Sequence, residues 1–361
     1  MALLPSSSLL SSSSSSPFSA AALLSSSAAT ASPALQLLLH SRFPRSSATS
    51  NQKVVLCQSC DTSRAFKTGC ESRRTLLYLS AATVAVGFWS SSSTANAADL
   101  IQRLQRDEFL TSIRDTLKIA VKENRDLVPH LLRLALNDAA TYDKESKSGG
   151  PNGSIRFSSE LQRPENQGLQ AAVKLLEDVK KKIDSESKGG PLSWADLTQL
   201  AGQSAAKRTF LDAAIKKCGG DENKGSQVFT AFGSNGQWGF FNKQFGRSES
   251  QEPDPEGRVI LWEQASVPEI KEKFSKLGLK PRQIAVLSAF LGPSQDAIEA
   301  KLATDPEVAP WVEKYQRSRE TTSQTDYEVD LIGAFTRLST LGQTINYEAY
   351  TYPPKKVKLK L

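Results

Sequence analysis

Histidine and cysteine are scarce in this chain of 361 residues, which contains two histidines and four cysteines. Cys57, Cys60 and Cys70 precede residue 71, so only Cys218 remains in the rest of the chain. A single cysteine cannot form a disulfide within its own chain, which excludes a disulfide framework. His130 is the only histidine after residue 40, so the folded part has one imidazole available for chemistry.

Long apolar runs are also lacking. Leu76–Phe88 is a mostly apolar run of 13 residues, fewer than the roughly 20 that a helix needs to span a bilayer. It follows the twin-arginine motif of Arg73 and Arg74 and precedes a small-x-small cleavage site formed by Ala95 and Ala97. A membrane anchor is the alternative, but the length of the run and its flanks favour a cleaved signal.

Acidic residues are absent from the first 50 positions, which are rich in serine and alanine, as in a transit peptide. We therefore predict a chloroplast transit region over 1–70, a twin-arginine lumenal targeting signal over 71–97 and one folded domain over 98–361. Two signals in series predict import into the chloroplast and then export into the thylakoid lumen. No transmembrane segment is expected in the mature chain.

The positive charge of the chain belongs mostly to this leader. The formal net charge is +7, but residues 1–97 hold seven of the 45 basic residues and two of the 38 acidic ones. The remainder therefore carries a net charge of only about +2, and the isoelectric point of about 9.1 does not indicate a nucleic-acid partner.

Helical periodicity dominates the rest of the chain. Apolar residues recur at three- and four-residue spacing, which predicts an all-α fold. The predicted helices cover residues 99–121, 129–139, 168–183, a stretch that starts at 194, 267–277, 281–291, 306–317 and 327–341. Residues 218–258 are rich in glycine, asparagine and phenylalanine and predict a long loop insertion, in which Gly233–Gly236 would allow a hairpin.

Seven short motifs occur in a distinctive order between residues 99 and 342. They are Pro129–Ala139, Gly149–Arg156, Asn166–Leu169, Leu192–Gly202, Pro253–Arg258, Ile284–Ser288, and the pair Asp305–Tyr315 and Tyr327–Gly342. In this order the chain resembles the plant ascorbate peroxidases of the haem peroxidase superfamily. The resemblance implies the plant haem-peroxidase fold, in which two helical lobes surround a cleft that holds haem in active members.

The distal half of the site implied by the resemblance is altered. Arg133 matches the distal arginine and Asn166 the asparagine that orients the distal base, but Asn137 takes the place of the distal histidine. Peroxidases use that histidine to move the peroxide proton. An asparagine side chain has no basic atom that accepts a proton at neutral pH, so this step has lost its group.

The proximal half is altered as well. Leu291 takes the position of the histidine that ligates iron, and leucine has no donor atom. Between Gly292 and Asp305 the chain is shorter than in the family, so the segment with the proximal aspartate has no counterpart. His130 lies seven residues before Asn137, roughly 10 Å along a helix, so it is expected at the helix start. We therefore expect no catalytic residue, no haem, no other cofactor and no metal.

The resemblance and the targeting signals together imply a non-catalytic lumenal protein, peripherally associated with the photosystem II membrane and connected with the oxidative stress response. Two alternatives stay open. One is an L-ascorbate peroxidase that uses unusual haem ligands. The other is a haem-free ascorbate-binding module that relies on Arg125 and Arg133.

Two further segments allow two interpretations each. The aromatic segment 229–245 either covers the cleft or forms a partner surface. The basic tail 353–361 is either solvated or docks on an anionic membrane or protein surface. The tail's candidate contacts are Lys355, Lys356, Lys358 and Lys360.

Overall fold

A computed structural model describes residues 75–186 and 188–352, with side chains from residue 99 onward. The predicted twin-arginine pair, Arg73 and Arg74, and the four lysines of the tail lie outside the described residues. Ala95 and Ala97 lie within the first helix, but their side chains are not described. Among the described residues, no helix combines the length and the apolar character needed to cross a bilayer.

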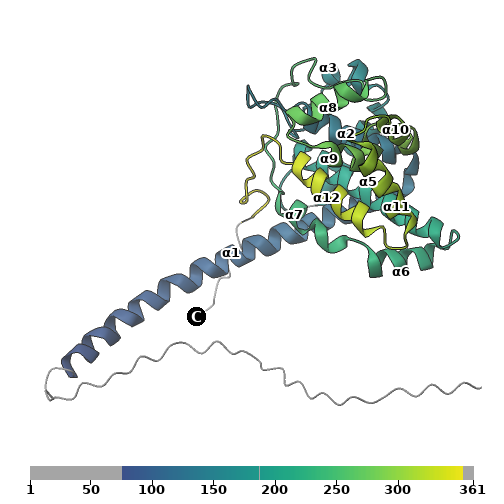
Figure 1. Cartoon of the computed structure of the whole chain (residues 1–361). Coiled ribbons are helices and arrows are strands. Elements are labelled where there is room, and N and C mark those ends of the chain that lie inside the picture. The colour runs from purple at the N-terminus through teal and green to yellow at the C-terminus, as the bar shows by residue number, and fades with distance from the viewer. Residues whose placement is uncertain (1–74, 187, 353–361) are drawn as a thin grey trace, which may run out of the picture. The chain divides into compact units, whose positions relative to one another are not determined.

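The regular secondary structure of the described residues is helical, apart from an isolated bridge between Asp143 and Ser148, and loops join the helices (Figure 1). The α-helices are α1 (Thr75–Glu123), α2 (Val128–Ala140), α3 (Ser158–Leu161), α4 (Gln170–Glu186), α5 (Trp194–Lys217), α6 (Glu222–Phe232), α7 (Gly239–Lys243), α8 (Val267–Lys276), α9 (Pro281–Val286), α10 (Gln295–Leu302), α11 (Ala309–Glu320) and α12 (Thr325–Leu338). Five 3₁₀ turns join them: η1 (Arg125–Leu127), η2 (Ser154–Arg156), η3 (Pro164–Asn166), η4 (Asn235–Trp238) and η5 (Ser288–Phe290). The prediction of an all-α fold is confirmed.

Helix α2 lies at the centre of the fold. Pro129 stands in its first turn, where a missing N–H costs no hydrogen bond. Ten of its 13 residues are buried, which is possible only because helices cover it on most sides. It packs most extensively against α5, which in turn contacts α1 and α6.

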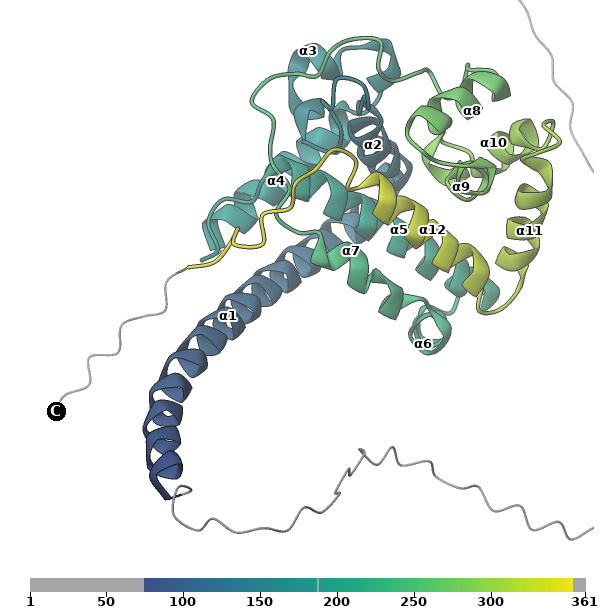
Figure 2. The same cartoon turned by 60° about the vertical axis from the view of Figure 1, so that its left-hand side comes forward.

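The helices form the two predicted lobes. In Figure 2, α8–α11 lie on one side, α1–α7 lie on the other, and α12 runs between them. Helix α12 contacts α9 in one lobe and α2 and α7 in the other. The functional site expected from the sequence would therefore lie where α2 faces η5, between the lobes.

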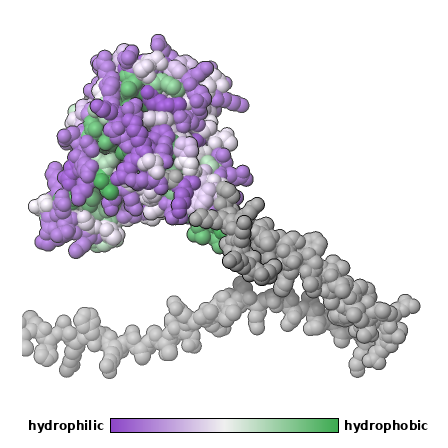
Figure 3. Space-filling model, turned by 180° about the vertical axis from the view of Figure 1, so that it is seen from behind, coloured by the Kyte–Doolittle hydropathy of each residue, from purple (hydrophilic) through white to green (hydrophobic). Residues whose placement is uncertain are grey.

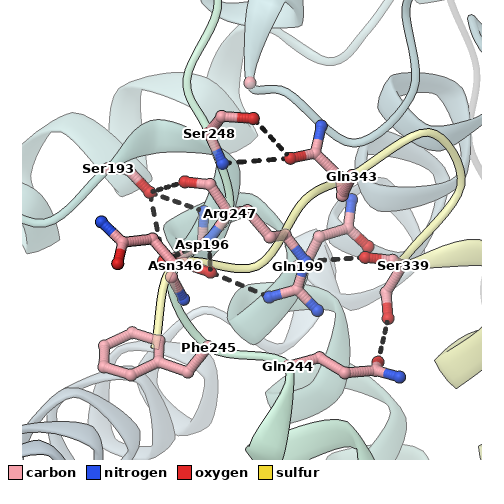
Figure 4. Close-up of polar contacts among 12 residues, drawn as sticks. Ser193, Asp196, Gln199, Gln244, Phe245, Arg247, Ser248, Ser339, Gln343 and Asn346 are labelled. Atoms are coloured by element: carbon pink, nitrogen blue, oxygen red, sulfur yellow. Dashed lines mark hydrogen bonds and ion pairs between the residues drawn. The ribbon is translucent and has the colours of Figure 1, made fainter. Parts of the chain in front are cut away.

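A buried ion pair fixes the start of α5 (Figure 4). The Asp196 carboxylate accepts hydrogen bonds from Arg247 Nη1 at 2.9 Å and from the backbone N–H of Gly246 at 2.9 Å. Arg247 Nε donates to the carbonyl of Ser339 at 2.7 Å, just after α12. Tyr350 donates its hydroxyl to Asp196 at 2.7 Å, so segments far apart in the sequence meet at one carboxylate.

The prediction of a long loop with a hairpin at 218–258 holds only for its second part, because residues 244–258 contain no helix, and the hairpin is wrong. Residues 222–243 are mostly helical, as α6, η4 and α7, and no strand occurs among the described residues. Asp221 caps α6 by accepting from two backbone N–H groups. Gly225 hides the helical period in the sequence, yet α6 needs it there, because a Cβ atom would come within 2.5 Å of Ile215.

Two smaller boundaries also differ from the prediction. The helix predicted over 281–291 ends at Val286, and the turn η5 carries the chain onward. The interval 292–305, where the sequence predicts no counterpart to the proximal segment of the family, contains α10.

Candidate functional site

Arg133, Asn137 and Asn166 come together as the sequence predicted. Arg133 and Asn137 are four residues apart on α2 and therefore share one face. Asn137 Nδ2 donates to Asn166 Oδ1 at 2.8 Å and to the carbonyl of Glu165 at 3.0 Å. Arg133 Nη2 donates to that same carbonyl at 3.0 Å. We call these three residues and the side chains that contact them the α2 site.

Trp262 completes the α2 site from the segment before α8. Its indole N–H donates to Asn137 Oδ1 at 2.8 Å, and the ring is fully buried in an edge-to-face contact with Phe274. The Asn137 amide thus donates through its nitrogen and accepts through its oxygen, all within the protein. The amide is also fully buried, so its donors and its oxygen are engaged inside the protein and not presented at a surface.

The distal arginine is paired as well. Arg133 Nη1 lies 2.7 Å from Glu263 Oε1, and its side chain is only 16% exposed. Lys301 Nζ donates to the carbonyl of Glu263 at 3.0 Å and holds this segment in place. Of the three guanidinium nitrogens of Arg133, only Nε lacks a hydrogen-bond partner among the described residues. Because Glu263 compensates the guanidinium charge, Arg133 would have to break this pair before it could stabilise another anion.

The opposite wall of the site is apolar. Leu291 and Phe290 are fully buried, and the Phe290 ring lies 5.3 Å from the ring of Phe335 on α12. Leu136, which precedes Asn137 on α2, is also fully buried. Helix α2 and η5 contact each other, so the elements that carry these apolar residues lie side by side.

The residues of the α2 site do not fit haem. The proximal position offers the aliphatic side chain of Leu291, which has no donor atom for iron. The distal amide of Asn137 is bonded to Trp262 and not directed at an open volume. Two open cavities among the described residues have volumes of about 310 and 350 Å³. The first is lined by Glu165 and so lies next to the α2 site, but neither is lined by Arg133, Asn137 or Leu291.

His130 lies at the start of α2, as predicted. Its ring is half-buried, and its Nε2 faces the turn at Gly168, 3.8 Å from where a Cβ would stand. Its Nδ1 is buried without a hydrogen-bond partner among the described residues. His130 takes no part in the hydrogen bonds of Asn137, so it does not replace the missing histidine.

Arg125, the other cation considered for ascorbate, is occupied by the insertion. Its Nη2 lies 3.2 Å from Glu222 at the start of α6, and its Nη1 lies 3.8 Å from Asp212 on α5. The helix that the sequence failed to predict therefore supplies a partner for this exposed arginine.

Two acidic side chains beside the site were not identified from the sequence. Asp138 is fully buried and accepts from the backbone N–H of Gly153 at 3.0 Å. Burial, reinforced by the nearby Glu160, raises the pKa of Asp138 well above its usual range. Burial also raises the pKa of Glu160. Only burial distinguishes these carboxyls from surface acids, and it depends on tertiary packing.

A third buried carboxylate stands on α10, near the proximal position. Glu299 accepts from both Nη atoms of Arg319, at 2.7 and 2.6 Å, and from Ser288 Oγ at 2.9 Å. Burial opposes ionisation, but the hydrogen bonds from Arg319 lower the pKa of Glu299. Within the part of the chain that the structure describes, no cluster of three or more histidine, cysteine or acidic side chains could hold a metal ion.

Comparison with known proteins agrees with this architecture. The sequence profile of the family described as peroxidase matches residues 113–330. The chain is 46% identical over 104 residues to L-ascorbate peroxidase 5, peroxisomal, from Arabidopsis thaliana, which covers 28% of this chain and 35% of the relative.

Two relatives match far more of the chain. Both are named "Thylakoid lumenal 29 kDa protein, chloroplastic". The one from Solanum lycopersicum is 62% identical over 296 residues, which covers 80% of this chain and 86% of the relative. The one from Arabidopsis thaliana is 57% identical over 319 residues, which covers 87% and 91%. These relatives confirm the predicted location in the chloroplast thylakoid lumen.

A solved structure matches as well. The crystal structure of the TL29 protein from Arabidopsis thaliana superposes with a TM-score of 0.69 at 65% sequence identity. It covers 69% of this chain and 99% of the solved one. The predicted peroxidase-like fold is therefore confirmed by sequence and by structure.

Proposed function

Since the chain belongs to the peroxidase family, we propose that it is a non-catalytic, ascorbate-peroxidase-like protein, a pseudoenzyme that acts in the lumen by binding. Its partner would be the lumenal face of the photosystem II membrane, with which it associates peripherally. A role in the oxidative stress response fits a member of this family placed beside that membrane. The proposal includes cleavage of the twin-arginine signal after Ala97, which leaves residues 98–361.

The hydrogen bond between Trp262 and Asn137 is the observation that carries the proposal. It occupies the group at the distal histidine position, while Leu291 stands at the proximal one. An enzyme of this family needs a ligand for iron and a base for the peroxide proton. The α2 site supplies neither of them, so we expect no haem and no turnover of hydrogen peroxide.

A haem titration of the purified lumenal protein tests this proposal. We expect no Soret band after addition of haem and no peroxide consumption with ascorbate as reductant. A Soret band that rises to one haem per chain, accompanied by ascorbate-dependent peroxide reduction, would support the alternative of an L-ascorbate peroxidase with unusual ligands.

Arg133 favours one further candidate, the haem-free ascorbate-binding module, because a partly buried arginine remains in the α2 site. Its pair with Glu263 and the pair of Arg125 with Glu222 count against it, since both cations already have anionic partners. Calorimetry with ascorbate decides between the ascorbate-binding module and the non-catalytic protein that we propose. Saturable heat that is lost in Arg125→Ala or Arg133→Ala would favour the module, and no heat with any chain would remove it.

Washing of thylakoid membranes tests the proposed association. The protein should stay with the membranes at low salt and dissociate as ionic strength rises, since contacts between exposed charges are screened. Deletion of residues 353–361 tests whether Lys355, Lys356, Lys358 and Lys360 contribute. Unchanged retention after the deletion would assign docking to another surface of the protein.

A further inference from the structure

Four basic side chains lack partners on the side of the molecule where α1, α5 and α7 meet. They are Arg114, Lys118, Lys207 and Lys243, and among the described residues none of them has an ion pair or a hydrogen bond from its side chain. Other arginines on or near the same helices are paired. Arg208, next to Lys207, bonds Asp212, and Arg125, just after α1, bonds Glu222.

Three of these cations lie close together. Arg114 and Lys118 are four residues apart on α1 and share one flank of the helix. Lys207 reaches this flank from α5, with its Nζ 5.4 Å from the centre of the Trp238 ring. Burial, together with the smaller effect of the charges of Arg114 and Lys118, lowers the pKa of Lys207 to about 8. An anion placed among the three would relieve this repulsion.

An apolar group stands beside the cations. Phe240 on α7 is 71% exposed, the largest fraction among the exposed large apolar side chains of the described residues. Its neighbours Trp238 and Phe241 are fully buried, so the core holds α7 in place while Phe240 projects outward. Lys243 Nζ lies 5.6 Å from the Phe240 ring.

Two of the three helices that carry these groups, α1 and α7, are neighbours. Helix α7 lies beside α1 in both views of the fold (Figures 1 and 2). The surface of the described body is mainly hydrophilic when seen from behind, with apolar groups in small patches (Figure 3). We define the α1–α7 face as Arg114, Lys118, Lys207, Lys243 and Phe240.

We propose that the α1–α7 face binds the surface of an anionic lipid bilayer, with its cations at the headgroups and Phe240 inserted among them. Unpaired cations beside an exposed aromatic ring are typical of proteins that lie on anionic membranes. Helix α1 has five exposed acids, Asp99, Asp107, Glu108, Asp115 and Glu123, and among these Asp107, two turns before Arg114, lies most nearly on the flank of Arg114 and Lys118. The inference rests on the proposed function and names lipid, not a protein subunit, as the direct partner.

Vesicle flotation tests the inference with the mature protein purified from the thylakoid lumen of plants that express full-length variants. The vesicles contain phosphatidylcholine alone or with phosphatidylglycerol, an anionic lipid. We expect binding only to the anionic vesicles. The double variant Lys118→Gln/Lys207→Gln should weaken it about tenfold, as the attraction of each cation to an anionic surface predicts.

Matched controls separate the α1–α7 face from general charge and apolarity. Lys174→Gln/Lys182→Gln removes the same charge from exposed positions on α4, and it should change binding less than twofold. Phe240→Ser should weaken binding about fivefold, whereas Phe232→Ser, at an exposed phenylalanine of α6, should not. Equal losses in test and control variants would overturn the assignment. Thermal melting verifies that each variant is folded.

The outcomes distinguish this inference from the proposed function. Absence of binding to anionic vesicles, with retention on thylakoid membranes, would overturn lipid binding and leave the proposed association standing, with a protein as the partner. Absence of binding to the anionic vesicles and to thylakoid membranes would contradict lipid binding and the proposed association alike. Binding to the vesicles that is lost with Lys118, Lys207 or Phe240 would support both.

Discussion

The α2 site and the α1–α7 face use polar groups in opposite ways. In the α2 site, both ends of the Asn137 amide are hydrogen-bonded within the protein, to Trp262, Asn166 and the backbone of Glu165. On the α1–α7 face, four cations form no ion pair and no side-chain hydrogen bond among the described residues, and two of them lie only over aromatic rings. The position where relatives of this fold carry out chemistry is therefore internal structure here. The free interactions that binding requires lie on a different surface.

Replacement of Trp262 in the α2 site should lower the free energy of unfolding more than any other change predicted below. Trp262→Ala leaves a large cavity and an unsatisfied buried amide, so the free energy of unfolding should fall by about 4 kcal/mol or more. Trp262→Phe keeps one aromatic ring but removes the five-membered ring that carries the N–H donor, so a smaller loss of about 1–3 kcal/mol is expected. Denaturant titration measures both values.

Trp311 provides the matched control, because it is half-buried and packs against Arg282 and Lys314 at the surface. Trp311→Ala should cost clearly less than Trp262→Ala. Similar losses at the two positions would show that Trp262 has no special place in the core.

The buried ion pair at the start of α5 should contribute more to stability than an exposed ion pair on the surface. Arg247→Met leaves the Asp196 carboxylate buried without its cation, which should lower the free energy of unfolding by about 3–5 kcal/mol. Arg103→Met removes an exposed ion pair with Asp99 and should cost less than about 1 kcal/mol. A loss below 1 kcal/mol for Arg247→Met in denaturant titrations would contradict this prediction.

The acids beside the α2 site should make stability depend on pH. The folded state raises the pKa of Asp138 and Glu160, chiefly through burial, so it binds more protons than the unfolded state. The stability they contribute is full below about pH 4 and is lost as pH rises toward their folded pKa values. Between pH 5 and 8 the free energy of unfolding should therefore fall, by at most about 1.4 kcal/mol per pH unit for each group.

Asp138→Asn tests the source of this dependence. The slope of unfolding free energy against pH should become shallower in this variant, while Asp99→Asn, at an exposed position, leaves the slope unchanged. The pKa of Glu299 is lowered in the folded state, so this carboxyl makes the free energy of unfolding rise with pH, but only at more acid pH. A wild-type stability that rises from pH 5 to 8 would contradict the prediction.

Restoration of the two histidines should have the smallest effect on function. Asn137→His/Leu291→His supplies the missing residue types, but Trp262 and the contact between α2 and η5 remain. We expect no Soret band after haem addition and no gain in peroxide reduction. Stable haem uptake by this double variant would show that the substitutions alone had closed the site.

The fold could be predicted from the order of seven motifs, because each motif keeps residues that pack the same helices together. The contacts that close the α2 site could not be predicted. Trp262 and Asn137 are 125 positions apart, and Arg133 and Glu263 are 130 apart, so only the folded chain pairs them. Trp262 also lies outside any regular helix, where periodicity gives no signal. Helix α6 was missed because its internal Gly225 suggested a loop.

The contact between Tyr350 and Asp196 has a consequence for the order in which the protein is made. Residues 346–352 are the last ones that the structure describes, yet the hydroxyl of Tyr350 reaches the buried carboxylate at the start of α5, 154 positions earlier. Arg106 on α1 donates to the carbonyls of Asn346 and Ala349, so this late segment also ties down the first helix. Because a chain is synthesised from its N-terminus, a nascent chain that ends before Tyr350 leaves this carboxylate without one of its donors. The fold is completed only after synthesis has passed that residue.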